Sequence, residues 1–356
     1  SMATEMNKDL LRNIGMLTED VEQATENDLM IVVKADTEER LSEVITFIHD
    51  ELNKKKTNTK KEENDFANTL NSALNMLPDA NIAVISVPGQ YAAREAKQAL
   101  KKGLHVMIFS DNVSLEEEIE LKKMGRELGL LVMGPDCGTA MINHVGLCFA
   151  NEVSSGGIGI VAASGTGLQE VAVQIDRLGY GISHAIGTGG RDLHEKIGGI
   201  MMLEGLKALE EDDSTEVITL VSKPPAPSVQ EEILHQVENC KKPVVVCFLD
   251  GDMKGNAPQH VEFASTLFDA AKKSIKSLNP EMEVDSGIGE DITNWMDEEK
   301  ARMDASQKFI RGLYCGGTLT SETVSVIRST GLKVKSNVAK KEEEKLLDIK
   351  QSIGHT

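Results

Sequence analysis

Short apolar runs alternate with longer amphipathic stretches along most of this chain. Such short runs are typical of buried strands, and the longer stretches have the 3.6-residue period of helices. This alternation predicts an α/β protein built on parallel sheets. The predicted strands are residues 29–34, 81–87, 105–109, 130–133, 158–163, 182–187, 217–222, 243–249 and 309–314.

Polar residues at the borders of the amphipathic stretches predict where helices begin and end. Thr37 is a candidate N-cap for a helix over 37–52. Ser114, with Glu117 three residues later, forms a capping-box pattern. Gly103 follows another helical pattern and is a candidate for the glycine that terminates it.

The order of these elements divides the chain into four parts. We expect a first α/β domain over 2–133, interrupted by a solvated, charged loop at 53–65, and a second over 134–276. Residues 277–307 are acidic and irregular and are expected to form a linker or lid. Residues 308–356 begin a third α/β domain that the chain does not complete. Ser1 ahead of Met2 is typical of tag removal, and both ends read as cut from a longer protein.

Composition narrows the class of partner. The net charge is −19 and aromatic residues make up 3% of the chain. Both features disfavour nucleic acid, although a small anionic ligand remains compatible through helix N-termini. Five cysteines without a CxxC pair indicate reduced thiols and a cytoplasmic protein. No apolar run is long enough for a membrane span, and no secretory signal opens the chain.

Ligands of parallel sheets bind at the carboxyl ends of strands. The most informative strand end is the turn Ser164-Gly165-Thr166-Gly167, which passes directly into a helical pattern. First-turn amides and the helix dipole attract anions, so we predict a phosphate site here. The alternative is that Ser164 or Thr166 only caps the helix.

Two further strand ends carry charge. Gly189 and Gly190 precede Arg191, which we expect to bind a phosphate or carboxylate, unless it is an ordinary surface charge. Lys223 follows the strand 217–222 in a proline-stiffened loop, where the alternative is a solvated side chain.

Two turns complete the set of candidates. Ser86, Pro88 and Gly89 lie where a strand meets a helix and are expected to line a nucleotide or CoA-type cleft. Cys137 lies in the turn 133–141, and we favour a buried structural thiol over a nucleophile because no histidine is spaced to pair with it. We find no zinc spacing, Walker A motif or GxSxG elbow, and predict no metal site.

Several of these segments carry a resemblance. "MGPDCGTA", "GIVAASGTGLQEV" and "IGTGGRDL" resemble the α subunit of succinyl-CoA synthetase and the NDP-forming acyl-CoA synthetases. With "VSKPPAP", "KPVVVCFL" and "GLYCGGTL" in the same order, nearly the whole chain resembles the FdrA family. The resemblance implies a Rossmann-like CoA-binding-type domain over 2–133, without its first strand, and a flavodoxin-like ligase domain over 134–276.

The FdrA resemblance also implies an activity. The family is linked to oxamate carbamoyltransferase in allantoin degradation, where oxalurate and phosphate give oxamate and carbamoyl phosphate. It implies a hetero-oligomer with operon-encoded partner subunits, and also a homodimer of this chain. Phosphate or carbamoyl phosphate is the implied ligand, and CoA is carried over by resemblance only.

The chain departs from the synthetase pattern at the residues that relay phosphate. The synthetases use a histidine between glycines, whereas here His260 is the only histidine of that region and lacks those glycines. Lys223 stands where the synthetases place the glutamate that holds this histidine. We therefore hypothesise that Lys223, with Arg191, faces a bound phosphate directly. The alternatives are an acyl-CoA ligase and a non-catalytic scaffold.

Overall fold

The computed structural model describes residues 3, 5–13, 15–25, 28–53, 67–249, 258–282, 290–304, 306–314 and 316–338. The chain divides into two compact units, residues 1–66 and residues 67–356. This division falls inside the predicted first domain, 2–133. The predicted loop 53–65 lies outside the described residues after Asn53.

The described part of the first unit holds three helices: α1 (Glu5–Asn13), α2 (Glu19–Gln23) and α3 (Glu38–Asn53). The ammonium of Lys8 on α1 donates a hydrogen bond to the carbonyl of Glu22 on α2 at 3.0 Å, which connects the two helices. The predicted helix over 37–52 is confirmed as α3, and the Thr37 hydroxyl accepts the Arg40 amide at 3.3 Å. The predicted strand 29–34 is wrong, since the described part of this unit offers no strand beside which it could form a ladder.

The second unit opens with α4 (Leu70–Met76) and a parallel sheet in the order β1-β2-β3, namely Ile82–Ile85, His105–Ile108 and Val132–Met133. The strands alternate with α5 (Gly89–Lys101) and α6 (Leu115–Leu128). The predicted capping box holds, because Ser114 accepts the Glu117 amide at 3.3 Å. Gly103, with φ of +80°, follows the last turn of α5 as predicted.

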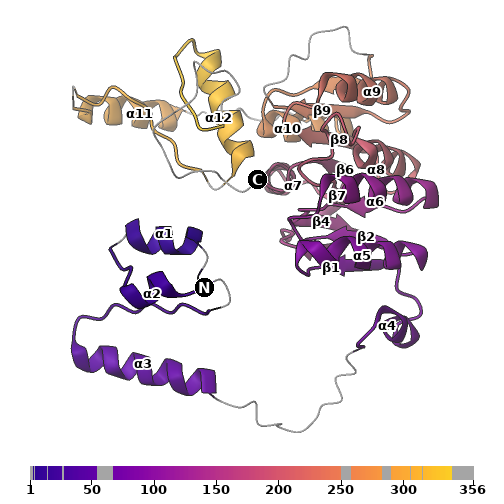
Figure 1. Cartoon of the computed structure of the whole chain (residues 1–356). Coiled ribbons are helices and arrows are strands. Elements are labelled where there is room, and N and C mark those ends of the chain that lie inside the picture. The colour runs from indigo at the N-terminus through magenta and orange to yellow at the C-terminus, as the bar shows by residue number, and fades with distance from the viewer. Residues whose placement is uncertain are drawn as a thin grey trace. The chain divides into compact units, whose positions relative to one another are not determined.

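A larger mixed sheet follows, in the order β10-β9-β8-β6-β7-β4-β5 (Figure 1). Its parallel strands are β6 (Ser155–Ala162), β7 (Ile182–Gly187), β8 (Val217–Ser222), β9 (Val244–Phe248) and β10 (Val261–Phe263). The strands β6 to β9 confirm the strands predicted between 158 and 249, whereas β10 was not predicted. The fully buried strands β8 and β9 are largely apolar on both faces, as is typical of central parallel strands.

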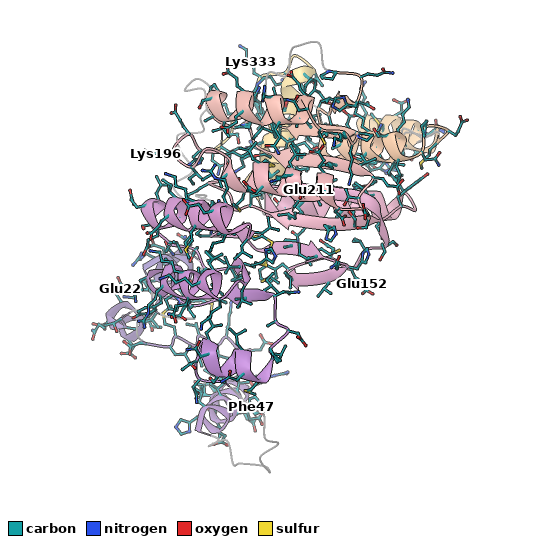
Figure 2. The ribbon with its side chains drawn as sticks, turned by 90° about the vertical axis from the view of Figure 1, so that its right-hand side faces the viewer. Glu22, Phe47, Glu152, Lys196, Glu211 and Lys333 are labelled. Atoms are coloured by element: carbon teal, nitrogen blue, oxygen red, sulfur yellow. The ribbon has the colours of Figure 1, made fainter. Side chains whose placement is uncertain are left out.

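Helices cover both faces of this sheet. Side chains of α8 (Ile200–Glu211) and α9 (Pro227–Glu238) share a core with Val161, Leu220 and Val246. Side chains of α7 (Gly165–Arg177) and α10 (Leu267–Leu278) share a second core with the alternate residues Ile160 and Val245. The charged ends of the surface segments lie outside these cores, for example Lys196 ahead of α8 and Glu211 at its end (Figure 2).

The sheet is not purely parallel, which corrects one expectation. The stretch treated as a turn between domains contains an antiparallel hairpin of β4 (Thr139–Ile142) and β5 (Val145–Cys148). Its two-residue loop puts Asn143 and His144 at φ of 48° and 63°, the left-handed geometry of a tight hairpin turn. Because that loop has no glycine, the sequence carries only a weak hairpin signal.

The C-terminal expectations are corrected in two places. The predicted linker 277–307 holds the end of α10 and a helix, α11 (Glu290–Arg302). The predicted strand 309–314 is not formed: these residues have no ladder partner, and Phe309 and Leu313 are exposed. They are followed by α12 (Gly317–Ser329), and residues from 339 onward lie outside the described chain. A third α/β domain beginning at 308 stays a prediction.

Candidate functional site

The turn after β6 caps α7 and leaves two main-chain N–H groups available to a ligand. The hydroxyl of Ser164 accepts the Gly167 amide at 3.0 Å, which is the capping alternative considered from the sequence. The amides of Gly165 and Thr166 find no acceptor within the described chain. Gly165 is exposed, and a side chain on it would meet only Thr139, 3.8 Å away. Capping and anion binding are therefore compatible, because they use different amides.

A second helix begins at the same place. The Ser164 and Thr318 hydroxyls lie 2.7 Å apart, and Thr318 belongs to the first turn of α12. Gly316 lies against Thr166, whose methyl would be 3.3 Å from a side chain there. Each helix N-terminus carries about half a positive charge. Two such ends in contact repel each other, and a bound anion would relieve that repulsion.

Sequence reasoning missed Thr318. Its only local signal is Gly316-Gly317-Thr318 ahead of a helical pattern, which repeats the small-residue character of the α7 turn. Nothing local shows that residues this far apart in the chain meet. Glu322 on the same helix also holds α12 in place, since its carboxylate accepts the Leu267 amide at 2.6 Å. Burial raises the pKa of Glu322, with Glu170 adding to that effect.

The register of the strands places the ends of β7 and β8 beside the end of β6, where the α7 turn begins. Ala162 pairs with Val221 on β8 and with Gly187 on β7. Two residues beyond these paired positions, Ser164 follows β6, Lys223 follows β8 and Gly189 follows β7. The three residues therefore follow adjacent strand ends. Lys223 is half-buried there. The structure thus places three of the predicted site segments side by side.

Arg191 has another partner. Its guanidinium lies 2.8 Å from Glu118 of α6 and donates to the carbonyl of Val113, also at 2.8 Å. The structure therefore gives Arg191 a structural contact in place of the predicted ligand, and its catalytic role stays untested. Gly190 is exposed with open space around it, whereas a side chain on Gly189 would lie 2.4 Å from the carbonyl of Pro135.

Glu118 belongs to a fully buried group of charges. Lys122 lies 2.8 Å from Glu118 and 2.8 Å from Asp192, and no side chain of the three is exposed. Lys122 also donates to the carbonyl of Thr188 at 2.9 Å. Asp192 in turn accepts the amides of Met201 and Met202 at the start of α8. We call the fully buried Glu118, Lys122 and Asp192, together with the partly exposed Arg191 that pairs with Glu118, the buried charge cluster, which joins α6 to the turn after β7.

A cavity of about 430 Å³ lies where the sequence predicts a nucleotide or CoA-type cleft, and binding of such a ligand stays a prediction. Ser86 and Pro88 line it, together with Asp111 and Asp136. Gly89 serves packing instead, because a side chain on it would lie 2.2 Å from the carbonyl of Asp111. The cavity belongs to residues 86–149, at the carboxyl ends of β1 and β2.

Cys137 is a structural thiol in this fold. It is 3% exposed, and burial raises its pKa to about 12. Its S–H faces the carbonyls of Thr139 and Gly187. A side chain on Gly187 would lie 2.6 Å from the sulfur, so glycine is required there. The nucleophile alternative is not supported, because a neutral thiol is a poor nucleophile.

His260 lies directly before β10, at the amino ends of the parallel strands of the large sheet. Its carbonyl accepts the amide of Val244, the first residue of β9, and its ring contacts the carbonyl of Val237 at 3.1 Å. Ser164 follows the carboxyl end of β6 in the same parallel sheet. The length of β9 separates the amino ends of these strands from their carboxyl ends by about 16 Å. His260 is therefore badly placed to carry phosphate to the α7 turn.

Comparison with known proteins identifies two segments. Residues 1–68 match the model of "AllF, heavy metal-associated domain", and residues 154–250 match that of "CoA binding domain". The chain is 48% identical to "Uncharacterized protein YahF" of Escherichia coli, over all of this chain and 68% of that protein. It is 29% identical to succinate–CoA ligase subunit alpha 2 of Archaeoglobus fulgidus, over 47% of this chain and 58% of the relative.

A solved structure shows a weaker likeness. The acetyl-coenzyme A synthetase 1 of Ca. Korarchaeum cryptofilum aligns with a TM-score of 0.45 and 19% identity, over 56% of this chain and 49% of that one. The chain therefore spans less than two thirds of the ligase subunit and about half of the synthetase.

The two matches imply a metal for residues 1–68 and CoA for residues 154–250. Residues 1–68 contain no cysteine, and no three His, Cys, Asp or Glu side chains come together to hold a metal ion among the described residues. The cavity lined by Asp111 and Asp136 lies outside the segment that matches the CoA binding domain. Among the described helices, none has the length and apolar character to cross a membrane.

Proposed function

This chain belongs to the family of the Escherichia coli protein YahF, and from that premise we propose that it is an FdrA-type subunit of an oxamate carbamoyltransferase. It would convert oxalurate and phosphate into oxamate and carbamoyl phosphate, as part of a hetero-oligomer with partner subunits. Its likeness to succinyl-CoA synthetase α subunits supplies the architecture, and the reaction differs.

The proposed step is a single displacement. An oxygen of hydrogen phosphate attacks the carbamoyl carbon of oxalurate, and the bond from that carbon to the oxamate nitrogen breaks. The proton of hydrogen phosphate passes to this nitrogen, which leaves as the amide of oxamate. The protein's part is to bind and orient two anions and to offset their charge.

Three groups divide that work. The open amides of Gly165 and Thr166 hold phosphate oxygens at the start of α7. The Lys223 ammonium, on the neighbouring strand end, stabilises charge on the transferred group. The observation that carries the proposal is the contact between Ser164 and Thr318, because it joins two helix N-termini at one point.

The competing function is an NDP-forming acyl-CoA ligase, which the similarity to succinate–CoA ligases favours. That reaction needs a histidine that receives phosphate at the α7 turn. His260 instead lies at the amino ends of the strands, whereas the α7 turn follows their carboxyl ends. Incubation with γ-labelled ATP and a search for acid-labile phosphohistidine separates the two. Label on His260 would support the ligase.

The test of the proposed function uses one reversed charge. Lys223→Glu should weaken binding of phosphate and of carbamoyl phosphate more than tenfold by calorimetry, because an ammonium is replaced by a carboxylate. Lys207→Glu is the matched control, since Lys207 is an exposed lysine on α8. The same variants are then assayed with the partner subunits for phosphate-dependent cleavage of oxalurate. Unchanged affinity in Lys223→Glu would contradict the proposal.

A further inference from the structure

The side-chain hydroxyl of Thr139 has no hydrogen-bond partner among the residues that the structure describes. Thr139 is the first residue of β4 and is only 4% exposed. Its main-chain carbonyl faces the sulfur of Cys137, but its hydroxyl neither donates nor accepts within the described chain. Enclosing a hydroxyl without a partner costs free energy. A ligand that bonds this hydroxyl would explain why that cost is tolerated.

The Thr139 hydroxyl faces the start of α7. A side-chain carbon placed on Gly165 would have one described neighbour outside its own helix within 4 Å, namely the Thr139 hydroxyl oxygen at 3.8 Å. Gly165 is exposed, and its amide is one of the two main-chain donors that the α7 turn leaves available. The space in front of Gly165 therefore has an N–H donor on one side and a hydroxyl on the other.

The order of the strands explains how a residue of β4 reaches the α7 turn. In the large sheet β7 lies between β6 and β4, and Gly187, the last residue of β7, pairs with Ala162 of β6. A side chain on Gly187 would lie 2.4 Å from the carbonyl of Thr139. Glycine at this position lets β4 approach the end of β7 closely. The hairpin that the sequence did not predict thus brings Thr139 beside Gly165.

The chemistry of the two donors favours an oxyanion. The amide of Gly165 lies at the positive end of the α7 dipole, which attracts negative charge. A hydroxyl forms shorter and stronger hydrogen bonds to a charged oxygen than to a neutral one. An oxyanion in front of Gly165 would accept from both groups, and it would supply the partner that the Thr139 hydroxyl lacks in the described chain.

We propose that Thr139 is a further binding residue of the phosphate site, and that its hydroxyl donates to the oxyanion held by the amides of Gly165 and Thr166. This inference rests on the proposed function, because it adds a donor to the same site. The oxyanion then lies between the start of α7 and the start of β4. Donors on two sides fix its orientation, which favours attack in one direction.

Calorimetric titration of the full chain with inorganic phosphate tests this role. Thr139→Val keeps the branched shape and should bind phosphate at least tenfold more weakly, because a hydrogen bond to a charged oxygen is lost. Its urea midpoint should not fall, since the deleted hydroxyl bonds no described residue. Thr139→Ser should keep an affinity close to that of the wild type. Thr323→Val is the control, because the Thr323 hydroxyl donates to the carbonyl of Leu319 in its own helix.

A second variant blocks the same space from the opposite side. In Gly165→Ala the methyl group would meet the Thr139 hydroxyl at an ordinary contact distance, and alanine is a good helix former. The fold should therefore be kept, while phosphate binding should fall more than tenfold because the methyl group takes the place of the ligand.

The outcomes separate this inference from the proposed function. If the wild-type chain binds phosphate and Thr139→Val binds it equally well, the role of Thr139 is wrong and the proposed function stands. Equal losses in Thr139→Ser and Thr139→Val, or full binding by Gly165→Ala, would also overturn this role. If the wild-type chain does not bind phosphate at all, both proposals are wrong.

Discussion

Single residues in this protein take their chemistry from where the fold puts them. Cys137 and Cys148 are both free thiols close together in sequence, yet only Cys148 is exposed. Burial raises the pKa of Cys137 to about 12, and that of Cys247 also to about 12. Because the thiolate is the reactive form, both buried thiols should be inert near neutral pH.

Labelling with iodoacetamide at pH 8 tests this difference. Cys148 should be alkylated at least tenfold faster than Cys137 or Cys247 in the native protein, as measured by peptide mass spectrometry. Raising the pH to 9 should leave the two buried thiols unlabelled, since that pH is still well below their pKa. In urea all of them should react at similar rates. Rapid native labelling of Cys137 would contradict its structural role.

At the scale of elements, the hydroxyls of Ser164 and Thr318 form a hydrogen bond between the N-terminal ends of α7 and α12. Thr318→Ala removes that bond. We expect faster amide hydrogen exchange across residues 317–329 and about fivefold weaker phosphate binding, because the second helix end is no longer fixed at the site. Thr323→Ala is the control, because the Thr323 hydroxyl donates to the carbonyl of Leu319 in its own helix. Equal exchange in the two variants would count against the role of Thr318.

The elements also show what the sequence was able to predict. The strands 182–187 and 217–222 were predicted with the bounds of β7 and β8, because a buried parallel strand is a continuous apolar run. The hairpin of β4 and β5 was missed, since its loop of Asn143 and His144 lacks the glycine signal. Strand 309–314 failed because an apolar run forms a strand only beside a partner.

The candidate site divides in the same way. Ser164 and Gly165 could be selected from the sequence because an anion site of this kind would be local to one turn, and Lys223 because it directly follows a strand. Their binding roles stay predictions. Thr318 and the pairing of Arg191 with Glu118 were missed, since each joins segments far apart in the chain. Sequence patterns report on neighbours in the chain, whereas these contacts are set by how the elements pack.

At the scale of the molecule, the buried charge cluster links the two sheets of the second unit. Glu118 and Lys122 lie on α6, beside the first sheet, and Asp192 and Arg191 follow β7 of the second. Charges of this kind are costly to bury, and they are retained only while each has its partner. We expect the relative placement of the two sheets, and so of the cavity and the proposed phosphate site, to depend on this pairing.

Lys122→Met tests that dependence. It leaves the carboxylates of Glu118 and Asp192 buried without their shared ammonium, and should lower the free energy of unfolding by about 3–5 kcal/mol. Lys97→Met is the control, because Lys97 pairs with the exposed Glu120 and such a surface pair contributes about 0–1 kcal/mol. Urea denaturation of both variants measures the difference. If Lys122→Met costs no more than Lys97→Met, the cluster does not hold the sheets together, and the packing of α6 against α8 must do so alone.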